Sequence, residues 1–194
     1  MKIAILGVWH VHAPDYTRTA LAHGEVVGFF ERSDALADAF ASHFGLPRFA
    51  TVEALLASDC EAVIVCSATK DHTADIIAAA KAGKHIFTEK ALSLSLDEAI
   101  EMRNMIKESG IKFCIAFTRL SAKQLVDAKK VAESGEIGDI VSFRCFCSHA
   151  GGIVGFIPEY CYDPAVAGGG AMIDMGFNSL YLARYIMGDV ESVS

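Results

Sequence analysis

Short apolar runs alternate with alanine-rich segments of helical spacing from residue 3 to residue 117. The apolar runs have the length of buried strands and cover residues 3–6, 26–30, 62–66, 85–88 and 112–117. The helical segments between them cover residues 13–23, 34–43, 52–58, 73–82 and 96–109. Strands that alternate with helices form parallel sheets that are covered on both faces. The pattern therefore predicts an α/β fold with a doubly wound parallel sheet.

Capping signals support these boundaries. Ser95 and Glu98 have the spacing of a capping box, in which a serine and a glutamate satisfy the first N–H groups of a helix. Gly83 and Gly110 follow helical segments, at the place where a left-handed C-cap is expected. Ser121 with Gln124 predicts a second capping box later in the chain.

The rhythm changes after Phe117. One alternating stretch, DIVSFRCFCSH at 139–149, predicts a half-buried strand, and a glycine-rich passage then leads to a predicted helix over 171–187. We predict a dinucleotide-binding domain at 1–118 and the beginning of an α+β domain at 119–194. A lone strand is not independently stable, so we expect further chain after Ser194, or a partner, to supply more strands.

Composition limits the class of partner. The net charge is −7 and no basic cluster stands out, which argues against nucleic acid and anionic membrane surfaces. The N-terminus lacks the apolar core of a secretory signal, no run approaches the roughly 18 apolar residues of a membrane span, and scattered cysteines favour a reducing compartment. We expect a cytoplasmic protein, and its mean hydropathy of +0.35 suggests a surface buried against another subunit.

The turn after the first predicted strand, AILGVWHVHA, occupies the position of a dinucleotide-binding loop. Such a loop has the pattern G-x-G-x-x-G, which allows close approach of a pyrophosphate. Here Gly7 is kept, whereas Trp9 and His12 replace the other two glycines and His10 lies between them. An ordinary strand–loop–helix connection without a nucleotide is the alternative.

Glu31 and Arg32 follow the second predicted strand, with Glu31 at 24 positions beyond Gly7. An acid at this place can accept both ribose hydroxyls of an adenosine and repel a 2′-phosphate, which favours NAD. Arg32 could instead bind that phosphate and favour NADP. A solvated Glu–Arg pair at a strand end is the structural alternative.

Polar residues also follow the third predicted strand, in VIVCSATKDH. Because the carboxyl ends of parallel strands border the ligand crevice of a doubly wound sheet, Ser67, Thr69 and His72 are candidate cofactor contacts. The N-terminus of the following helix gives Asp71 a structural role through capping and the helix dipole.

Glu89 and Lys90 end the fourth predicted strand, at the same edge of the sheet. A lysine in a partly dry crevice has a lowered pKa and can transfer a proton. A solvated surface lysine is the common alternative. A second polar group favours the catalytic interpretation, because Asp174, Asn178 and Tyr181 form one stripe on the helix predicted after Gly170. We expect that stripe to line a cavity.

Cys145, Cys147 and His149 alternate on one face of the predicted strand and could bind zinc. Zinc sites mostly use C-x-x-C-type spacing and need a fourth ligand, which the sequence does not indicate. Free thiols in the core are therefore the favoured interpretation, and we predict no metal site.

Taken in order, these segments resemble the Gfo/Idh/MocA family, the relatives of glucose–fructose oxidoreductase and inositol dehydrogenase. The resemblance covers nearly all of the chain and rests on GKHIFTEK, EAVIVCSATKDH, SGEIGDI and GGGAMIDMG, among other segments. It implies a Rossmann domain followed by an α+β domain whose open sheet packs on a partner subunit, giving a homo-oligomer. It also implies a nicotinamide cofactor and a sugar or polyol substrate.

By position, the resemblance makes Lys90 the catalytic lysine and matches Asp174 to the aspartate of the family's late helix motif. It also identifies departures from the family pattern. Asn178 stands where a catalytic histidine is common, and Tyr181 where an acid is usual. Ala91 replaces a proline that is often cis, and a cis bond before alanine costs about 3 kcal/mol, so we expect a trans bond or a strained loop.

These features lead to one mechanistic hypothesis and one alternative. As an NAD(P)-dependent oxidoreductase, the protein would use Lys90 to take a hydroxyl proton, with Glu89 and Asp174 aiming the lysine. Asn178 and Tyr181 would hold neighbouring substrate hydroxyls. The alternative is a catalytically silent nucleotide-binding or assembly protein of the same fold, because asparagine cannot transfer a proton near neutral pH.

Overall fold

The computed structural model describes residues 1–193 and divides them into two compact units. The first unit comprises Met1–Ala116 with Ile157–Gly168, and the second comprises Phe117–Phe156 with Gly169–Ser194. Residues 157–168 thus belong to the first unit, although they lie within the predicted second domain. The domain division at residue 118 itself stays a prediction.

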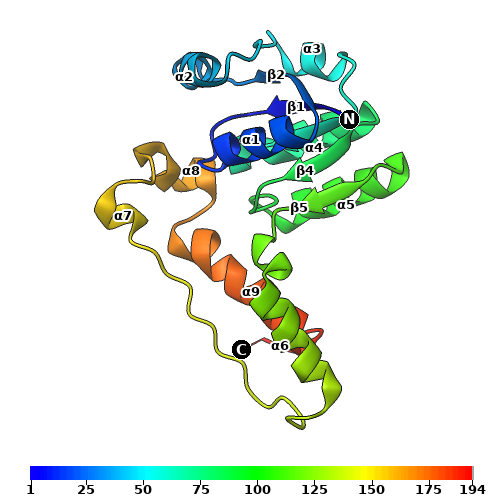
Figure 1. Ribbon diagram of the computed structural model, residues 1–194, viewed down its shortest axis with the longest axis vertical. Coiled ribbons are helices and arrows are strands. Elements are labelled where there is room, and N and C mark those ends of the chain that lie inside the picture. The colour runs from blue at the N-terminus through cyan, green and yellow to red at the C-terminus, as the bar shows by residue number, and fades with distance from the viewer. Residues whose placement is uncertain (194) are drawn as a thin grey trace. The chain divides into compact units, whose positions relative to one another are not determined.

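The first unit contains a five-stranded sheet in which every neighbouring pair is parallel, in the order β2-β1-β3-β4-β5 (Figure 1). The chain leaves β1 toward β2 on one side and continues through β3 on the other, so the strand order reverses between β1 and β3. This arrangement confirms the predicted doubly wound α/β fold. The strands are β1 Lys2–Leu6, β2 Glu25–Phe30, β3 Ala62–Val65, β4 His85–Thr88 and β5 Phe113–Ile115.

Helices cover the sheet on two faces, and each face has its own apolar core. Phe29 and Phe40 belong to the core under α1 (Ala13–His23) and α2 (Asp34–Phe44). The other core includes Ile76 and Met102, from helices that belong to a group of three: α3 Val52–Leu56, α4 His72–Lys81 and α5 Leu96–Ser109. Among residues 1–193, no helix is long and apolar enough to cross a membrane.

The strand register brings the predicted site residues to one edge of the sheet. Leu6 pairs with Phe30 and with Val65, and Val65 pairs with Thr88. The residues directly after these strand ends, including Gly7, Glu31 and Glu89, therefore start at the same edge. In doubly wound sheets, ligands bind at this edge, where the strand order reverses.

The caps agree with the sequence in one case and differ in another. Ser95 accepts a hydrogen bond from the Glu98 N–H at 3.2 Å, and Gly83 and Gly110 have φ angles of +68° and +67°. The predicted capping box at Ser121 is wrong, because Ala122 caps α6 (Lys123–Ser134) without a side-chain bond. Ser121 instead ends the 3-10 turn η2 (Thr118–Ser121), where its hydroxyl donates to the Thr118 carbonyl.

The second unit is helical in the described residues. Besides α6 and η2, it contains α7 Gly151–Val154, the π-helical turn η4 Met172–Gly176 and α9 Phe177–Met187. The predicted strand at 139–149 is not formed, because no segment within residues 1–193 pairs with its backbone. The expected alternation is nevertheless present, since Phe143, Cys145 and Cys147 are partly buried and the residues between them are exposed.

Gly7 should be the glycine of the first unit that tolerates a side chain least. It has a φ of +81°, and a Cβ added there would lie 2.3 Å from Cα of Ser67, so backbone would have to move. We expect Gly7→Ala to lower the free energy of unfolding by at least about 3 kcal/mol. Gly83→Ala is the matched control, since it has a similar φ of +68° and open space around it, and should cost about 1 kcal/mol. Equal shifts in urea unfolding midpoints would contradict this account.

Candidate functional site

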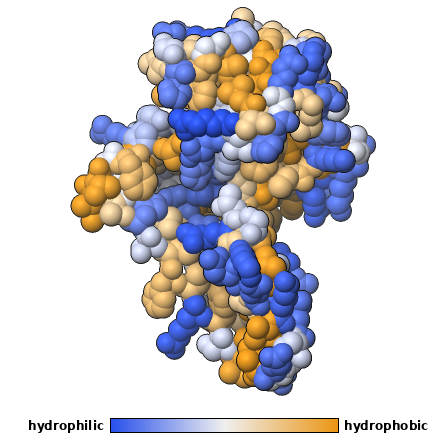
Figure 2. All heavy atoms as spheres, in the orientation of Figure 1, coloured by the Kyte–Doolittle hydropathy of each residue, from blue (hydrophilic) through white to orange (hydrophobic). Residues whose placement is uncertain are grey.

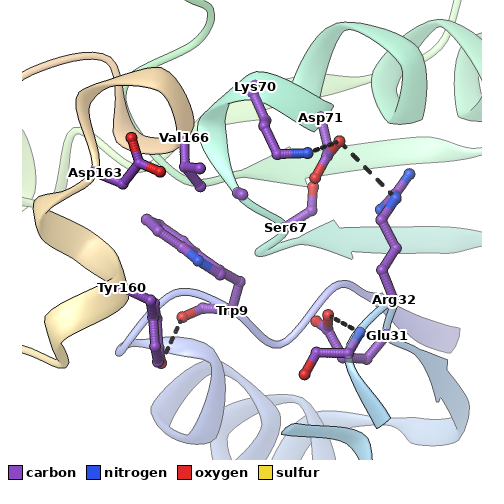
Figure 3. A pocket seen from close by; sticks show the side chains of 11 residues that line it. Trp9, Glu31, Arg32, Ser67, Lys70, Asp71, Tyr160, Asp163 and Val166 are labelled. Atoms are coloured by element: carbon purple, nitrogen blue, oxygen red, sulfur yellow. Dashed lines mark hydrogen bonds and ion pairs between the residues drawn. The ribbon is translucent and has the colours of Figure 1, made fainter. Parts of the chain in front are cut away.

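A cavity of about 300 Å³ opens at the edge of the sheet where the strand order reverses. Figure 3 shows Trp9, Tyr160, Asp163 and Val166 on one side of it and Glu31, Arg32 and Asp71 on the other. The remaining lining residues are Ser33, Ser67, Ala68 and Lys70. All of these residues belong to the first unit. The volume is at the lower end of the range for small-molecule pockets.

Glu31 is buried at the base of this cavity with 5% of its surface exposed. Its carboxylate accepts hydrogen bonds from the N–H groups of Val8 at 2.7 Å and Ser33 at 2.9 Å. Glu31 thereby ties the turn after β1 to the start of α2. Because a carboxylate offers about four acceptor positions, it retains capacity for further donors such as ribose hydroxyls.

Arg32 lines the cavity and is held by a buried acid. Its guanidinium donates two hydrogen bonds to the carboxylate of Asp75, at 2.6 and 3.1 Å, and lies 4.0 Å from Asp71. Burial alone would lower the pKa of Arg32, but the bonds to Asp75 outweigh it and raise that pKa. Part of the positive charge that could meet a phosphate is therefore neutralised by the protein itself.

Ser67 lines the cavity and carries an unpaired polar atom. Its hydroxyl oxygen is buried and has no hydrogen-bond partner within the described residues. A buried, unpaired hydroxyl is unfavourable unless something satisfies it. Gly7 packs directly against this residue, which keeps the backbone at this corner close enough for a ligand to approach. These residues fit a dinucleotide at the switch point of the sheet.

A second polar cluster surrounds Glu89, which follows β4 and is 1% exposed. His12 Nδ1 lies 2.7 Å from Oε1 of Glu89, and the hydroxyl of Tyr16 donates to the same oxygen. The other oxygen accepts the backbone N–H of Lys90 at 2.9 Å. Of the two charged residues after β4, Glu89 has a carboxylate that is enclosed by donors from the turn after β1 and from α1. Lys90 contributes its backbone N–H to this enclosure.

The cluster shifts the ionisation of its members. Burial acts to raise the pKa of Glu89, but hydrogen bonds from His12 and Tyr16 and the nearby His10 outweigh it and hold this pKa at about 2. The hydrogen bond to Glu89 raises the pKa of His12. Burial lowers the pKa of His10 to about 4, so this ring is neutral near neutral pH.

Thr69 and His72 are buried between the strand ends. The two ring nitrogens of His72 lie 3.0 Å from the Ser67 carbonyl and 2.9 Å from the Ala91 carbonyl, which connects the ends of β3 and β4. The peptide between Lys90 and Ala91 is cis, so of the two alternatives expected here, a trans bond or a strained loop, the trans bond is wrong. Cofactor contact by Thr69 and His72 stays a prediction.

The late helix residues are held within the second unit. Asp174 Oδ2 lies 3.2 Å from Nε2 of His149. The amide of Asn178 donates toward the carbonyls of Asp174 and Met175, and its oxygen accepts the Tyr181 hydroxyl at 2.8 Å. The Tyr181 ring stacks on Phe117 with centroids 4.5 Å apart. The convergence of Asp174 with Lys90 and the cavity expected beside this helix stay predictions.

The two alternating cysteines are close to each other. Their sulfurs lie 3.7 Å apart, and the hydroxyl of Ser179 lies 3.7 Å from Cys147. His149, which could have joined them at a metal, bonds to Asp174 instead. Both cysteines are free thiols, but they are of intermediate burial and not in the core, and the absence of a metal site stays a prediction.

Residues 1–117 match the family model described as the oxidoreductase family with an NAD-binding Rossmann fold. Residues 125–194 match the GFO/IDH/MocA C-terminal domain. The chain belongs to the Gfo/Idh/MocA family. The predicted resemblance is therefore confirmed.

Relatives in the Gfo/Idh/MocA family include named dehydrogenases. The chain is 28% identical to scyllo-inositol 2-dehydrogenase (NAD(+)) of Bacillus subtilis, over 100% of this chain and 56% of the relative. It is 31% identical to levoglucosan dehydrogenase of Pseudarthrobacter phenanthrenivorans, over 84% and 43%. In fold it is similar to scyllo-inositol dehydrogenase of Lactobacillus casei with bound NAD(H) and scyllo-inositol, with a TM-score of 0.81, 24% identity and coverage of 97% and 56%. The chain spans about half the length of these relatives.

Several lining residues of this Gfo/Idh/MocA chain were not predicted from the sequence. Tyr160 lies in η3 (Glu159–Tyr162), Val166 lies in α8 (Pro164–Ala167), and Asp163 is the N-cap residue of α8. Tyr160 is more than 150 positions after Trp9, and its hydroxyl donates to the Trp9 carbonyl. The Asp163-Pro164 pair signals a helix start, but it says nothing of what that helix packs against. Tyr16, the partner of Glu89, was not predicted either, because the sequence shows only that it lies on a helix.

The neutral ring of His10 predicts a loss of stability in mild acid. Its pKa of about 4 in the folded protein lies below the unfolded value of 6.5, so the unfolded chain binds more protons as the pH falls between them. Between pH 7 and 5, the wild type should lose about 2 kcal/mol more unfolding free energy than His10→Gln. His23→Gln, at an exposed position, is the control and should follow the wild type. Parallel curves for His10→Gln and the wild type in urea unfolding would refute the assignment.

Proposed function

We propose that this protein is an NAD(P)-dependent oxidoreductase that transfers hydride between nicotinamide and a carbinol carbon of a sugar, polyol or related compound. The observation that carries the proposal is the cavity at the switch point of the sheet, with the unpaired Ser67 hydroxyl facing no protein partner in residues 1–193. Membership in the Gfo/Idh/MocA family and the named activities of the relatives support it.

In this proposal the cavity holds the adenosine end of the cofactor. Glu31 accepts ribose hydroxyls, Ser67 pairs with a polar group of the cofactor, and Trp9 supplies an aromatic wall. Gly7, His10, His12, Thr69 and His72 complete the proposed cofactor contacts. The buried charge of Glu31 opposes a 2′-phosphate and Asp75 already engages Arg32, so NAD is favoured over NADP.

Lys90 is the proposed catalytic residue. A bound nicotinamide would supply the hydride acceptor for the carbinol carbon. Lys90 takes the hydroxyl proton as the carbonyl forms, and Glu89 and Asp174 aim and tune the lysine. Asn178 and Tyr181 hold neighbouring substrate hydroxyls, a role that an amide and a phenol can perform because both donate and accept hydrogen bonds.

A silent nucleotide-binding protein of the same fold is the second candidate. It is favoured by Asn178, whose amide and carbonyl are both engaged by η4, α9 and Tyr181. A cofactor titration followed by Trp9 fluorescence separates the candidates, because Trp9 lines the proposed cofactor cavity. Binding without turnover across a panel of polyols, sugars and sugar acids supports the silent protein, and no binding of either cofactor rules out both.

Assembly into a homo-oligomer through the second domain, in the cytoplasm, belongs to the same proposal. Figure 2 shows apolar atoms gathered over α7, and Ile153, Val154 and Phe156 are 89%, 68% and 56% exposed. Exposed apolar groups of this kind are typical of surfaces that another protein covers. All six cysteines are free, which fits a reducing compartment.

Replacing the unpaired hydroxyl should separate binding from folding. We expect Ser67→Ala to leave the stability of the free protein unchanged or slightly higher, because no hydrogen bond of the described residues is lost. The same change should weaken cofactor binding about fivefold, which corresponds to one lost hydrogen bond. Thr73→Val is the matched control, since Thr73 also has a buried, unpaired hydroxyl but does not line the cavity. If both variants bind the cofactor like the wild type, Ser67 is no cofactor contact.

Lys90→Ala tests the chemical step. It should lower kcat by a factor of 10² to 10⁴, the usual contribution of a general acid or base, and change the cofactor Kd less than threefold. Lys84→Ala is the control on the same strand region, since Lys84 bonds to the carbonyls of Ser58 and Cys60 away from the cavity. Near-normal turnover of Lys90→Ala on a proven substrate would exclude Lys90 as the proton acceptor.

A further inference from the structure

We propose that His12 and Glu89 form a proton-relay dyad, in which Nε2 of the His12 ring exchanges protons between Lys90 and solvent. This inference rests on the proposed oxidoreductase function and deepens it. It gives the turn after β1 a chemical role in addition to cofactor contact.

The hydrogen bond between the two side chains determines which ring nitrogen is available. Glu89 is ionised near neutral pH, since its pKa is held at about 2 by its partners despite its burial. An ionised carboxylate only accepts, so His12 Nδ1 must donate to Oε1 across their 2.7 Å separation. The lone pair of the neutral ring therefore lies on Nε2. The His12 side chain as a whole is 48% exposed.

Glu89 is well suited to orient the ring. It is 1% exposed and is fixed by the Tyr16 hydroxyl on the same oxygen as His12 and by the Lys90 N–H on the other. A histidine whose one nitrogen is held by a buried carboxylate, while the other faces the reaction, is the usual arrangement of a general base. The same carboxylate stabilises the imidazolium that forms when the ring takes a proton.

His12 and Lys90 both contact the Glu89 carboxylate, His12 through Nδ1 on one oxygen and Lys90 through its backbone N–H on the other. The bond to Glu89 raises the pKa of His12, and the positive charge of Lys90 opposes that shift. His10 also faces the pair, with Nδ1 at 3.7 Å from Glu89, and it accepts the N–H of His12 at 3.2 Å. Asp15 on α1 is the remaining charged group that contributes to the pKa of His12.

The proposed proton path balances with the hydride transfer. In the oxidation direction the substrate loses a hydride to the cofactor and its hydroxyl proton to the Lys90 amine. The Lys90 ammonium then passes this proton to Nε2 of His12, and the His12 imidazolium releases it to water. Glu89 keeps its negative charge throughout. Asn178 cannot take this role, because an amide has no basic nitrogen near neutral pH.

The same residues could be thought of as metal ligands, since His10, His12 and Glu89 bring ligand atoms within 4.8 Å of one another. The distances favour a hydrogen bond. Two ligands bound to one tetrahedral zinc at about 2.0 to 2.1 Å lie roughly 3.3 Å apart. The His12–Glu89 separation of 2.7 Å is shorter, and Nδ1 of His10 already accepts a backbone N–H.

The first experiment measures the dyad without relying on turnover. In the full chain, the Cε1 proton of His12 is titrated by NMR and assigned by its loss in His12→Asn. We expect a midpoint above 6.5 in the wild type and a lower midpoint in Glu89→Gln. A midpoint that Glu89→Gln does not move overturns the dyad, whether or not a substrate has been found.

The second experiment measures proton transfer on a turned-over substrate. His12→Asn keeps a side-chain N–H that can donate to Glu89 but has no basic nitrogen, so kcat measured at saturating cofactor should fall at least 10²-fold. Glu89→Gln should move the acidic limb of the pH–kcat profile to lower pH. Imidazole should restore His12→Ala at least tenfold, whereas pyrazole, which has a similar shape but is not protonated near neutral pH, should not.

The outcomes separate this inference from the proposed function. If the wild type binds cofactor and turns over substrate, and His12→Asn has the same kcat, the relay is overturned. The proposed oxidoreductase function is then unaffected. Equal effects of imidazole and pyrazole show a purely structural role and also overturn the relay. If a chelator abolishes activity and Zn²⁺ restores it, these residues form a metal site and the proton relay is rejected. Absence of any turnover in the wild type counts against the proposed function, while the NMR titration still decides the dyad.

Discussion

A buried negative charge at the end of β4 organises this site. Taking the carboxylate of Glu89 out of water is unfavourable unless donors surround it. The protein supplies them from His12 in the turn after β1, from Tyr16 on α1 and from the backbone N–H of Lys90. The need to satisfy one carboxylate therefore joins two segments that are more than 70 positions apart in the chain, and it fixes the start of α1 against the end of β4.

A similar constraint acts at the end of β2. Glu31 is buried and accepts N–H groups from the turn after β1 and from the start of α2, and Asp75 on α4 engages Arg32. Acidic groups thus support the edge of the sheet on both sides of the position between β1 and β3 where the strand order reverses. The cavity is lined by polar residues such as Glu31 and Asp71 and by the aromatic rings of Trp9 and Tyr160, which suits a ligand that has both sugar and base.

The departures from the Gfo/Idh/MocA pattern have a common structural consequence. Trp9 and His12 stand where glycines are usual, so the turn carries side chains into the space that a minimal loop leaves to the cofactor. The structure uses both of them: Trp9 forms a wall of the cavity together with Tyr160, and His12 bonds to Glu89. The retained Gly7 is the position where backbone approaches backbone, so it is the glycine that cannot be replaced in the same way.

The sequence by itself determined the alternation of strands and helices, the parallel sheet, the cap at Ser95 and the edge of the sheet to which Glu31, Ser67 and Lys90 belong. These features follow from periodicity and local capping, which act over a few residues. Only the tertiary structure decided that Tyr160 and Val166 line the cavity, that Tyr16 serves Glu89, and that the stretch at 139–149 forms no strand in the described chain. The first two depend on contacts between segments far apart in sequence, and the last depends on a neighbouring strand, so local patterns cannot determine them.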